Sequence, residues 1–235
     1  MRFPFVLPLL AFAAFSLLRA EEASLFNGKD LSAWQEPRGS WTVAAAVTLS
    51  PSDPRTFVAR PGEGVFFNTT SGKGVNLLSK MQHGDCSLHV EFSVPKDSNS
   101  GVYLMGRYEV QILDSFGKKE IAEHDCGAIY PRWKDGRYFE GHTPKLNASK
   151  APGEWQYFDI VFRAPRFDAN GSKIQNAKFE SVKHNGQLIH ENVEVTGPTR
   201  SSKYNDETAL GPLMLQGDHG PVAFRNLRIE TLNGK

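Results

Sequence analysis

The residues from Asn99 to Ser115 read NSGVYLMGRYEVQILDS. After an opening turn signal, this stretch alternates between apolar and polar side chains, which is the period of a β-strand. The apolar positions are Tyr108, Val110 and Ile112, and the polar positions are Arg107, Glu109 and Gln111. We therefore predict a strand with one face in a core. Its other face either holds a polar ligand or forms an Arg–Glu pair on a solvated surface.

Similar short patterns follow one another along the rest of the chain, and no stretch has a sustained helical period. The strand-like segments are 41–43, 56–59, 75–78, 88–94, 155–163, 179–183, 187–190, 212–216 and 222–232. Asn185-Gly186 separates two of them and is a strong hairpin signal. Many short strands between Gly and Pro residues predict an all-β protein, a sandwich or jelly roll of two antiparallel sheets. Residues 120–150 are the least regular, and loops of that length tend to be functional.

The first twenty residues have the layout of an export signal. A basic start precedes an almost wholly apolar run over 3–18, and Ala20 is followed by two glutamates. We predict a secretory signal peptide over 1–20, one mature domain over 21–235, and a secreted or periplasmic protein with no membrane span after cleavage. An uncleaved anchor is the alternative, although the run is shorter than the roughly 20 residues of a membrane span.

The charge balance argues against two classes of partner. The 27 Lys and Arg residues nearly match the 26 Asp and Glu residues, which leaves a formal net charge of +1. Nucleic-acid binders present a strongly basic face, and charge-driven membrane binders carry polybasic segments. We therefore expect neither partner. The oligomeric state is not indicated by the sequence.

The chain has two cysteines, Cys86 and Cys126. They either form one disulfide, which an exported protein allows, or remain buried thiols. Neither has a second Cys or a paired His at the spacing of zinc ligands. We predict no cofactor, while scattered acidic residues leave a structural or catalytic divalent cation open.

Polar residues that can carry chemistry gather in three clusters. The first comprises Arg107, Glu109 and Gln111, with Asp114 beyond the strand end. The second comprises His124 and Asp125, and the third comprises Gln216, His219 and Arg225. Trp133, within the irregular region, is the best candidate for a platform under a sugar ring.

Several of these candidates also have a structural interpretation. The segment 218–220 consists of turn-forming residues around a histidine. Arg225 has the strand phase of Leu227 and Ile229, so it is either a ligand contact or a partly buried structural arginine. Asp114 either binds a ligand or caps the next turn. His124 is either a site residue or a surface histidine.

Ordered motifs along the mature chain resemble the 3-keto-disaccharide hydrolase domain family, long catalogued as a domain of unknown function. They are Phe26-Asn27-Gly28-Lys29-Asp30-Leu31 with Trp34, Asn99 to Leu104, Tyr108 to Asp114, Cys126 to Tyr130, Gly153-Glu154-Trp155, and Leu215-Gln216 with His219-Gly220 and Phe224-Arg225-Asn226. The resemblance implies a jelly roll of the concanavalin A-like lectin and glucanase type, with sugar bound over a concave sheet. This fold agrees with the strand pattern.

The resemblance also implies an exported enzyme acting on glycosides whose glucose unit is oxidised at C3. A C3 ketone acidifies the C2 hydrogen, so a base removes it, the group at C1 leaves, and water adds to the enone. Such a site needs a base, a donor to the C3 oxygen and an acid for the leaving group. We assign the proton transfers to Glu109, with His124 or Asp125 as its counterpart. The other assignments are Arg107, His219 and Arg225 to the enolate, and Gln111, Asp114, Trp133 and Gln216 to the sugar.

Two other functions fit the same residues. A conventional glycosidase would pair Glu109 with Asp114 or Asp125. A carbohydrate-binding module without catalysis is also compatible, because lectins share this fold. The sequence has no Gly-x-Ser-x-Gly elbow, phosphate-binding glycine loop or His-Glu-x-x-His motif, so it does not indicate the chemistry of those sites.

Overall fold

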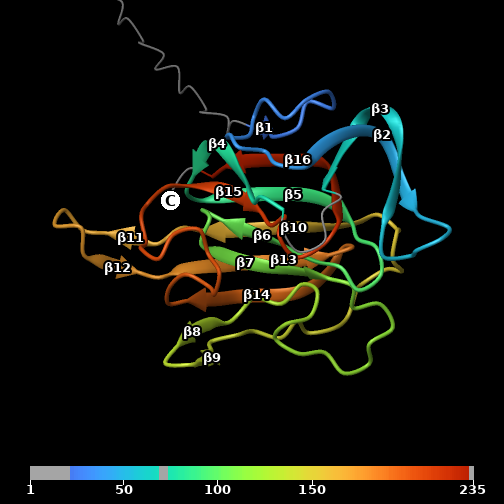
Figure 1. The fold of residues 1–235 in the computed structure, drawn as a ribbon. Coiled ribbons are helices and arrows are strands. Elements are labelled where there is room, and N and C mark those ends of the chain that lie inside the picture. The colour runs from blue at the N-terminus through green and yellow to red at the C-terminus, as the bar shows by residue number, and fades with distance from the viewer. Residues whose placement is uncertain (1–21, 69–73, 233–235) are drawn as a thin grey trace, which may run out of the picture.

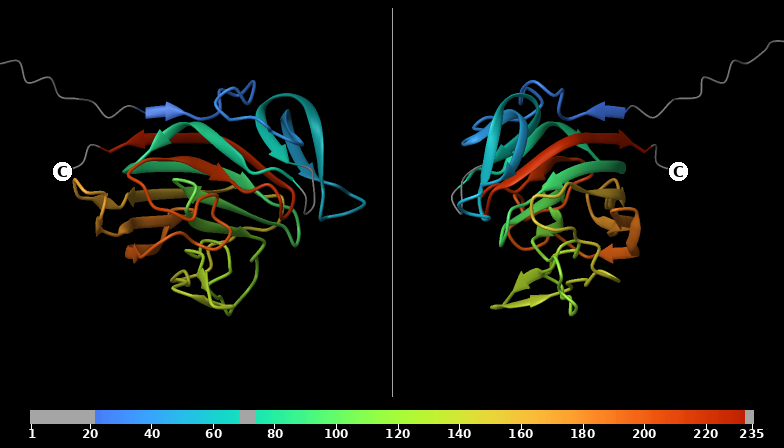
Figure 2. Two further views of the ribbon diagram at one scale, coloured as in Figure 1. Left: turned by 60° about the vertical axis from the view of Figure 1, so that its left-hand side comes forward. Right: turned by 90° about the vertical axis from the view of Figure 1, so that its right-hand side faces the viewer.

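The computed structural model describes residues 22–68 and 74–232, which form two antiparallel β-sheets stacked as curved layers (Figures 1 and 2). In spatial order, the large sheet contains β14 (Gln187–Val195), β13 (Ala177–His184), β10 (Gln156–Arg163), β5 (Cys86–Ser93), β16 (Val222–Thr231), β3 (Phe57–Asn68) and β2 (Trp41–Leu49), with β1 (Glu22–Ser24) also paired to β16. The small sheet contains β4 (Leu77–His83), β15 (Gly211–Leu215), β6 (Asn99–Leu104) and β7 (Tyr108–Leu113). The predicted all-β, two-sheet jelly-roll sandwich is confirmed.

The main core lies between the two sheets and is built from alternate residues of their strands. The large sheet contributes Leu88, Val90 and Phe92 from β5 and Phe158, Ile160 and Phe162 from β10. The small sheet contributes Tyr108, Val110 and Ile112 from β7, all at 0% exposure, as the alternation predicts. Burial of these side chains between the sheets is the main apolar contribution to folding. It also turns the polar residues of β7 to the outer face of the small sheet.

The hairpins show where local sequence decides the chain path and where pairing overrides it. Asn185 and Gly186 have φ of 50° and 80°, as a type I′ turn requires. The turn expected at Asn99 is wrong, because Asn99 begins β6 and the chain reverses later, at Met105 and Gly106. β6 pairs with both β7 and β15, and two ladders of hydrogen bonds outweigh the turn preference of its first residues.

Two small strand pairs extend the sandwich. β8 (Arg132–Lys134) and β9 (Arg137–Phe139) form a hairpin within the region predicted to be irregular, and it projects beyond the layers (Figure 2). This excursion is tied to both sheets, since Tyr130 N donates to Glu109 O of β7 at 3.0 Å and Lys145 N donates to Ile189 O of β14 at 3.0 Å. β11 (Arg166–Phe167) and β12 (Lys173–Gln175) pair in a second hairpin.

The two cysteines are free and buried, so the structure has thiols rather than a disulfide. Burial raises the pKa of the Cys126 thiol to about 12 and that of Cys86 further, which leaves both unreactive. The predicted signal peptide over 1–20 lies outside the described residues. No helix among residues 22–68 and 74–232 is long and apolar enough to cross a membrane.

Candidate functional site

A polar pocket lies on the outer face of the small sheet, over β6 and β7. Its volume is about 60 Å³, and its lining residues are Asn99, Tyr103, Glu109, Gln111, Tyr130, Ser201, Gln216 and His219. Tyr103 lies directly opposite Glu109 in the β6–β7 ladder. The floor of the pocket is thus set by strand register, while its walls come from three connections that are distant in sequence.

Glu109 is the buried carboxyl of this floor, and only 2% of the residue is exposed. Burial raises the pKa of Glu109 to about 8, the charge of Asp218 raises it too, and the hydrogen bond from Tyr103 opposes the shift. In the orientation that satisfies its amide, Gln111 donates through Nε2 to Ser100 O at 2.8 Å and to Glu109 Oε1 at 3.1 Å. The contacts that hold the carboxyl therefore come from neutral donors.

Gly101 makes room for the carboxyl on the neighbouring strand. A Cβ at this position would overlap Glu109 Oε1 and would lie 3.0 Å from Cε2 of the Tyr103 ring. The Glu109 side chain thus lies against the backbone of β6, where a larger residue would displace it.

Tyr103 connects Glu109 to Gln216. Burial raises the pKa of Tyr103 well above its usual value, and the Glu109 charge raises it further, so the phenol keeps its proton and donates a hydrogen bond to the Glu109 carboxyl. Gln216 Nε2 approaches the phenol oxygen at 3.5 Å. The backbone of Gln216 is held by Gly101 O and by Ser100 Oγ, at 2.9 and 2.8 Å. Its Oε1 is buried without a hydrogen-bond partner among the described residues.

The rim of the pocket carries groups able to move or share protons. His219 is half exposed, and its Nδ1 lies 2.6 Å from Asp218 Oδ1. Burial, together with Tyr138, raises the pKa of the Tyr130 phenol to about 12. Ser201 has a φ of 63°, a left-handed conformation that is uncommon outside glycine and tends to mark functional segments. The rim therefore offers donors around a carboxyl at the floor.

Comparison with known proteins identifies the family. The family model of the 3-keto-α-glucoside-1,2-lyase-like domain matches residues 21–230. The chain belongs to this family. This confirms the resemblance carried by the ordered motifs. No match was found in a search of curated proteins.

Solved structures of three candidate glycosyl hydrolases from Parabacteroides distasonis ATCC 8503 resemble this family member. The first is 29% identical, with a TM-score of 0.68, and the match covers 90% of this chain and 84% of that chain. The second is 20% identical, with a TM-score of 0.60 and coverage of 90% and 100%. The third is 15% identical, with a TM-score of 0.56 and coverage of 90% and 94%. The last two establish likeness of fold alone.

Four predicted site residues meet in the pocket of this family member, namely Glu109, Gln111, Gln216 and His219. Asp125 does not reach it. Asp125 accepts hydrogen bonds from Lys118 Nζ at 2.6 Å, Ser115 Oγ at 2.9 Å and Ala122 N at 2.9 Å. Although burial raises its pKa, these bonds hold the pKa below its usual value. These hydrogen bonds to the Asp125 carboxylate stabilise the loop after β7.

Asp114 and His124 also lie outside the pocket lining. Asp114 accepts hydrogen bonds from the backbone of Asp97 at 3.0 Å and Phe116 at 3.3 Å, so it caps turns. The His124 ring packs against Tyr130 and Tyr138, with centroids 5.1 and 4.8 Å away. His124 therefore packs against the Tyr130 ring without lining the pocket.

Trp133 and Arg107 also lie outside the pocket lining. Trp133 lies in β8, is 44% exposed, and has the Arg200 guanidinium over its ring at 4.2 Å. Arg107 is buried in the β6–β7 turn, where its Nη2 pairs with Asp206 Oδ1 at 2.8 Å. Arg107 O also accepts a hydrogen bond from Thr199 N at 2.9 Å. Arg107 thus anchors the segment that brings Ser201 to the pocket.

Arg225 lies on the outer face of the large sheet, away from the pocket. The strand phase placed it with Leu227 and Ile229, which are buried. The register of β16 shifts between Arg225 and Arg228, and Asn226 has a φ of 46°. This bulge adds a residue and reverses the face of Arg225, a change that alternation cannot reveal.

Four pocket residues were not predicted as site residues, namely Asn99, Tyr103, Tyr130 and Ser201. Asn99 and Tyr103 share a strand phase, but the turn interpretation of their segment concealed it. A hairpin register for 99–113 would have placed Tyr103 opposite Glu109. Ser201 lies in a connection without any sequence signal.

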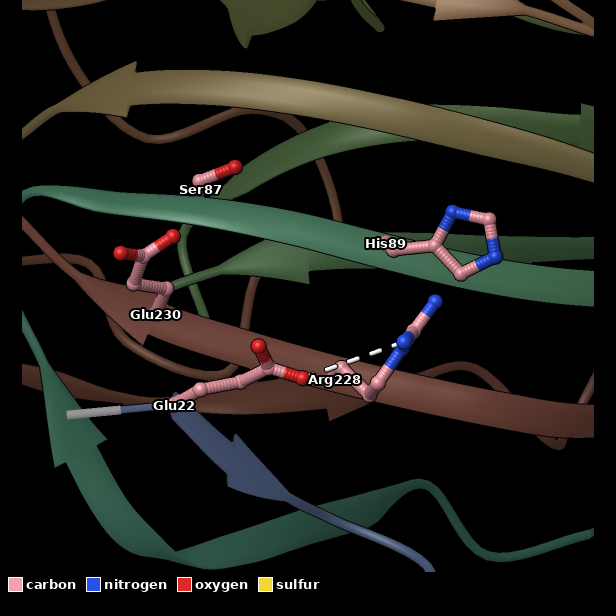
Figure 3. Close-up of a pocket in the computed structure, with 5 residues that line it drawn as sticks. All are labelled: Glu22, Ser87, His89, Arg228 and Glu230. Atoms are coloured by element: carbon pink, nitrogen blue, oxygen red, sulfur yellow. Dashed lines mark ion pairs between the residues drawn. The ribbon is translucent and has the colours of Figure 1, made fainter. Parts of the chain in front are cut away.

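A larger cavity of about 220 Å³ lies on the outer face of the large sheet, lined by Glu22, Ser87, His89, Arg228 and Glu230 (Figure 3). The dashed line in Figure 3 marks the ion pair between Arg228 and Glu22, whose charged atoms are 3.9 Å apart. His89 Nδ1 lies 2.6 Å from Asp159 Oδ1. None of the five lining residues has a buried side-chain polar atom without a partner. Its two acids, Glu22 and Glu230, are exposed and half-buried, so this cavity lacks the buried acid of the smaller pocket.

Acidic, His and Cys side chains are not gathered for metal binding in the described part of the chain. No group of three or more of them is positioned to hold an ion within residues 22–68 and 74–232. The candidate site is thus defined by Glu109 and its hydrogen-bonding neighbours.

Proposed function

We propose that this protein is an enzyme that cleaves 3-keto-glycosides by removing the C2 proton and eliminating the group at C1. The observation that carries the proposal is the Glu109 carboxyl, buried in the floor of a polar pocket with a pKa raised to about 8. Such a carboxylate is a stronger base than an exposed one, and its pKa lies near neutral pH, where general catalysis is efficient. Membership of the lyase-like family supports action on carbohydrates.

The proposed reaction balances without an oxidant or reductant, because the substrate arrives with its C3 ketone. Glu109 takes the C2 proton, and the electrons of that C–H bond form an enolate on the C3 oxygen. The enolate collapses to a C1=C2 double bond as the C1–oxygen bond breaks. The leaving oxygen gains a proton, and water adds across the double bond where the net result is hydrolysis.

The rim supplies candidates for the remaining roles. A donor to the C3 oxygen stabilises the charge that develops there, and such donors are effective when water is excluded. In the proposal, His219 protonates the leaving oxygen and the Tyr130 hydroxyl donates to the C3 oxygen. Both line the same small pocket as Glu109.

The geometry favours this reaction over a glycosidase that uses two carboxylates. That mechanism needs a second carboxyl on the other side of the scissile bond. Asp114 and Asp125, the partners considered from the sequence, hold turns and a loop instead. Glu109 is the acidic residue among those that line the pocket, and Asp218 at the rim is engaged by His219 Nδ1 at 2.6 Å.

The test compares a 3-keto-glucoside with the same glycoside in its unoxidised form. We expect release of the aglycone from the keto sugar alone, with kcat/KM rising with pH through about 8 as Glu109 loses its proton. Release from both sugars would support a conventional glycosidase instead. Binding without turnover, unchanged in Glu109→Gln, would contradict an enzymatic role and support a carbohydrate-binding module.

Export is part of the proposal and rests on residues 1–20. Cleavage after Ala20 would leave a mature chain that begins at Glu21. Mass spectrometry of the protein recovered from the periplasm or medium tests this, and an intact Met1 in the exported protein would contradict it.

A further inference from the structure

We propose that Gln216 selects the substrate by requiring a hydroxyl hydrogen, and that it thereby sets which way the sugar faces in the pocket. The inference rests on the proposed function for the class of ligand, a glycoside with a C3 ketone. It names the atom that contacts the ligand, Gln216 Oε1, and states that the sugar group facing this atom must be a hydrogen-bond donor.

The basis is an unsatisfied acceptor in the pocket lining. Gln216 is 5% exposed, and its Oε1 is buried with no hydrogen-bond partner among the described residues. Buried polar groups in folded proteins are nearly always paired, because leaving one unpaired costs about 1–3 kcal/mol. An unpaired carbonyl that lines a cavity therefore points to a ligand that completes it.

Tyr103 explains why the amide presents its oxygen rather than its nitrogen. The phenol donates its hydrogen bond to the Glu109 carboxyl, so its oxygen is left to accept a hydrogen bond from its other neighbour. Gln216 Nε2 faces that oxygen at 3.5 Å. The backbone of Gln216 is also held on both sides by β6. The direction of Oε1 is thus built into the site before a ligand arrives.

Gln111 provides an internal contrast within the same pocket. Its amide nitrogen is used by Ser100 O and Glu109 Oε1, at 2.8 and 3.1 Å. Gln111 therefore holds the acid in place, whereas Gln216 has an acceptor to offer. The two glutamines of the pocket have different tasks although their side chains are identical.

A carbonyl oxygen discriminates strongly between sugar groups. A hydroxyl can donate to it, whereas a ketone or ether oxygen would face it with like partial charge. The C3 ketone of the substrate therefore points away from Gln216, and one of the hydroxyls left unoxidised points toward it. A sugar oxidised at that second position would be rejected.

The test is a panel of monodeoxy and deoxyfluoro analogues of a 3-keto-glucoside at C2, C4 and C6. We expect one deoxy position to lower kcat/KM about ten- to a hundredfold with the wild-type protein. The deoxyfluoro analogue at that position should lose as much, because fluorine cannot donate. With Gln216→Leu the penalty should fall below about threefold, since the acceptor is gone.

Two controls keep the outcome interpretable. Gln216→Met retains an unbranched side chain in case the leucine variant does not fold, and thermal melting checks both. Gln175→Leu, at an exposed glutamine of β12, should keep the wild-type discrimination. A deoxy penalty that persists in both Gln216 variants, or a deoxyfluoro sugar as good as the parent, would overturn the proposal.

The same panel separates this inference from the proposed function. Dissociation constants from isothermal titration calorimetry report on Gln216 even where no sugar is turned over. If the deoxy analogues bind more weakly than the parent sugar but no sugar is turned over, the proposed reaction is contradicted and the role of Gln216 is supported. If the keto sugar is turned over but the effect of removing a hydroxyl is the same with and without Gln216, the reaction is supported and the role of Gln216 is contradicted.

Discussion

Two strands of this molecule place a glutamate on an outward polar face, and the two carboxyls have opposite electrostatics. Glu91 of β5 accepts hydrogen bonds from Arg225 Nε at 2.6 Å and from Asn226 Nδ2 at 2.7 Å. Although burial raises its pKa, these partners hold the pKa of Glu91 below its usual value. Glu109 of β7 has neutral donors as its partners, and burial raises its pKa to about 8.

The difference shows that strand alternation places a carboxyl but does not give it a function. Both strands alternate in the same way, with apolar residues in the core. What separates them is the surroundings of the outer face. On the large sheet a cation pairs with the acid across the strands, and on the small sheet three connections cover it. An acid that is paired to arginine stays ionised. A buried acid that has only neutral hydrogen-bond donors can exchange a proton near neutral pH.

The largest expected effect comes from removing each carboxyl in turn. Glu109→Gln keeps the size of the side chain but cannot accept the C2 proton, so we expect kcat/KM for a 3-keto-glucoside to fall about 10²-fold or more. The matched variant Glu91→Gln should lose less than tenfold. A loss below tenfold in Glu109→Gln would assign that residue to structure or binding. Glu109 and Glu91 would then not differ in catalytic role.

The dependence of stability on pH should have opposite signs for the two acids. The pKa of Glu109 is raised from 4.5 to about 8 on folding, so the folded protein loses stability as pH rises through this window. Gln does not titrate, so Glu109→Gln should gain stability relative to wild type between pH 5 and pH 9. At about 1.4 kcal/mol per pH unit, the gain is on the order of a few kcal/mol.

Glu91 should behave in the reverse way. Its folded pKa lies below the usual value of 4.5, so it contributes stability above that pH and loses it as pH falls through the folded pKa. Glu91→Gln should therefore be less stable than wild type at pH 7, and the deficit should shrink below about pH 4. Urea unfolding of both variants across the pH range measures this. Parallel pH curves for the two variants would show that their surroundings do not differ as the structure indicates.

The sequence predicts which strands carry Glu91 and Glu109 better than it predicts the charges around these two acids. Alternation placed the apolar residues of β5, β7 and β10 in the core, because the two-residue period of a strand is a local property. It also placed Glu109 and Gln111 together on one outward face. The start of β6 was mistaken for a turn, because its pairing with β7 and β15 depends on residues distant in sequence.

Other features that the sequence did not predict concern charged residues and the side chains packed around them. Asp125 is a residue type that can act as a catalytic acid, but its carboxylate accepts hydrogen bonds from Lys118 and Ser115. Arg225 changes face at a bulge that alternation does not reveal. The covering of Glu109 by Tyr130 and Ser201 depends on how two long connections return to the sheet. None of these arrangements follows from strand alternation, so the local pattern cannot determine them.

The smallest expected effect tests whether the β6 backbone beneath Glu109 positions its carboxyl. Gly101 does not have a left-handed φ, so its backbone accepts alanine, but the added Cβ would lie 3.0 Å from Cε2 of the buried Tyr103 ring, and we expect the free energy of unfolding to fall by about 1–3 kcal/mol. The methyl group of the alanine would overlap Glu109 Oε1 and push the carboxyl outward. We expect Gly101→Ala to lower kcat/KM about tenfold, because small displacements of a reacting group are costly.

The pH profile distinguishes positioning from a general loss of structure in Gly101→Ala. A carboxyl pushed toward the mouth of the pocket is better hydrated, so the rise of kcat/KM with pH should move from about 8 toward the acid side. A variant that is merely less stable would lower the melting temperature and leave the pH profile in place. That second result would mean that Glu109 owes its raised pKa to the walls above it and not to the strand beneath it.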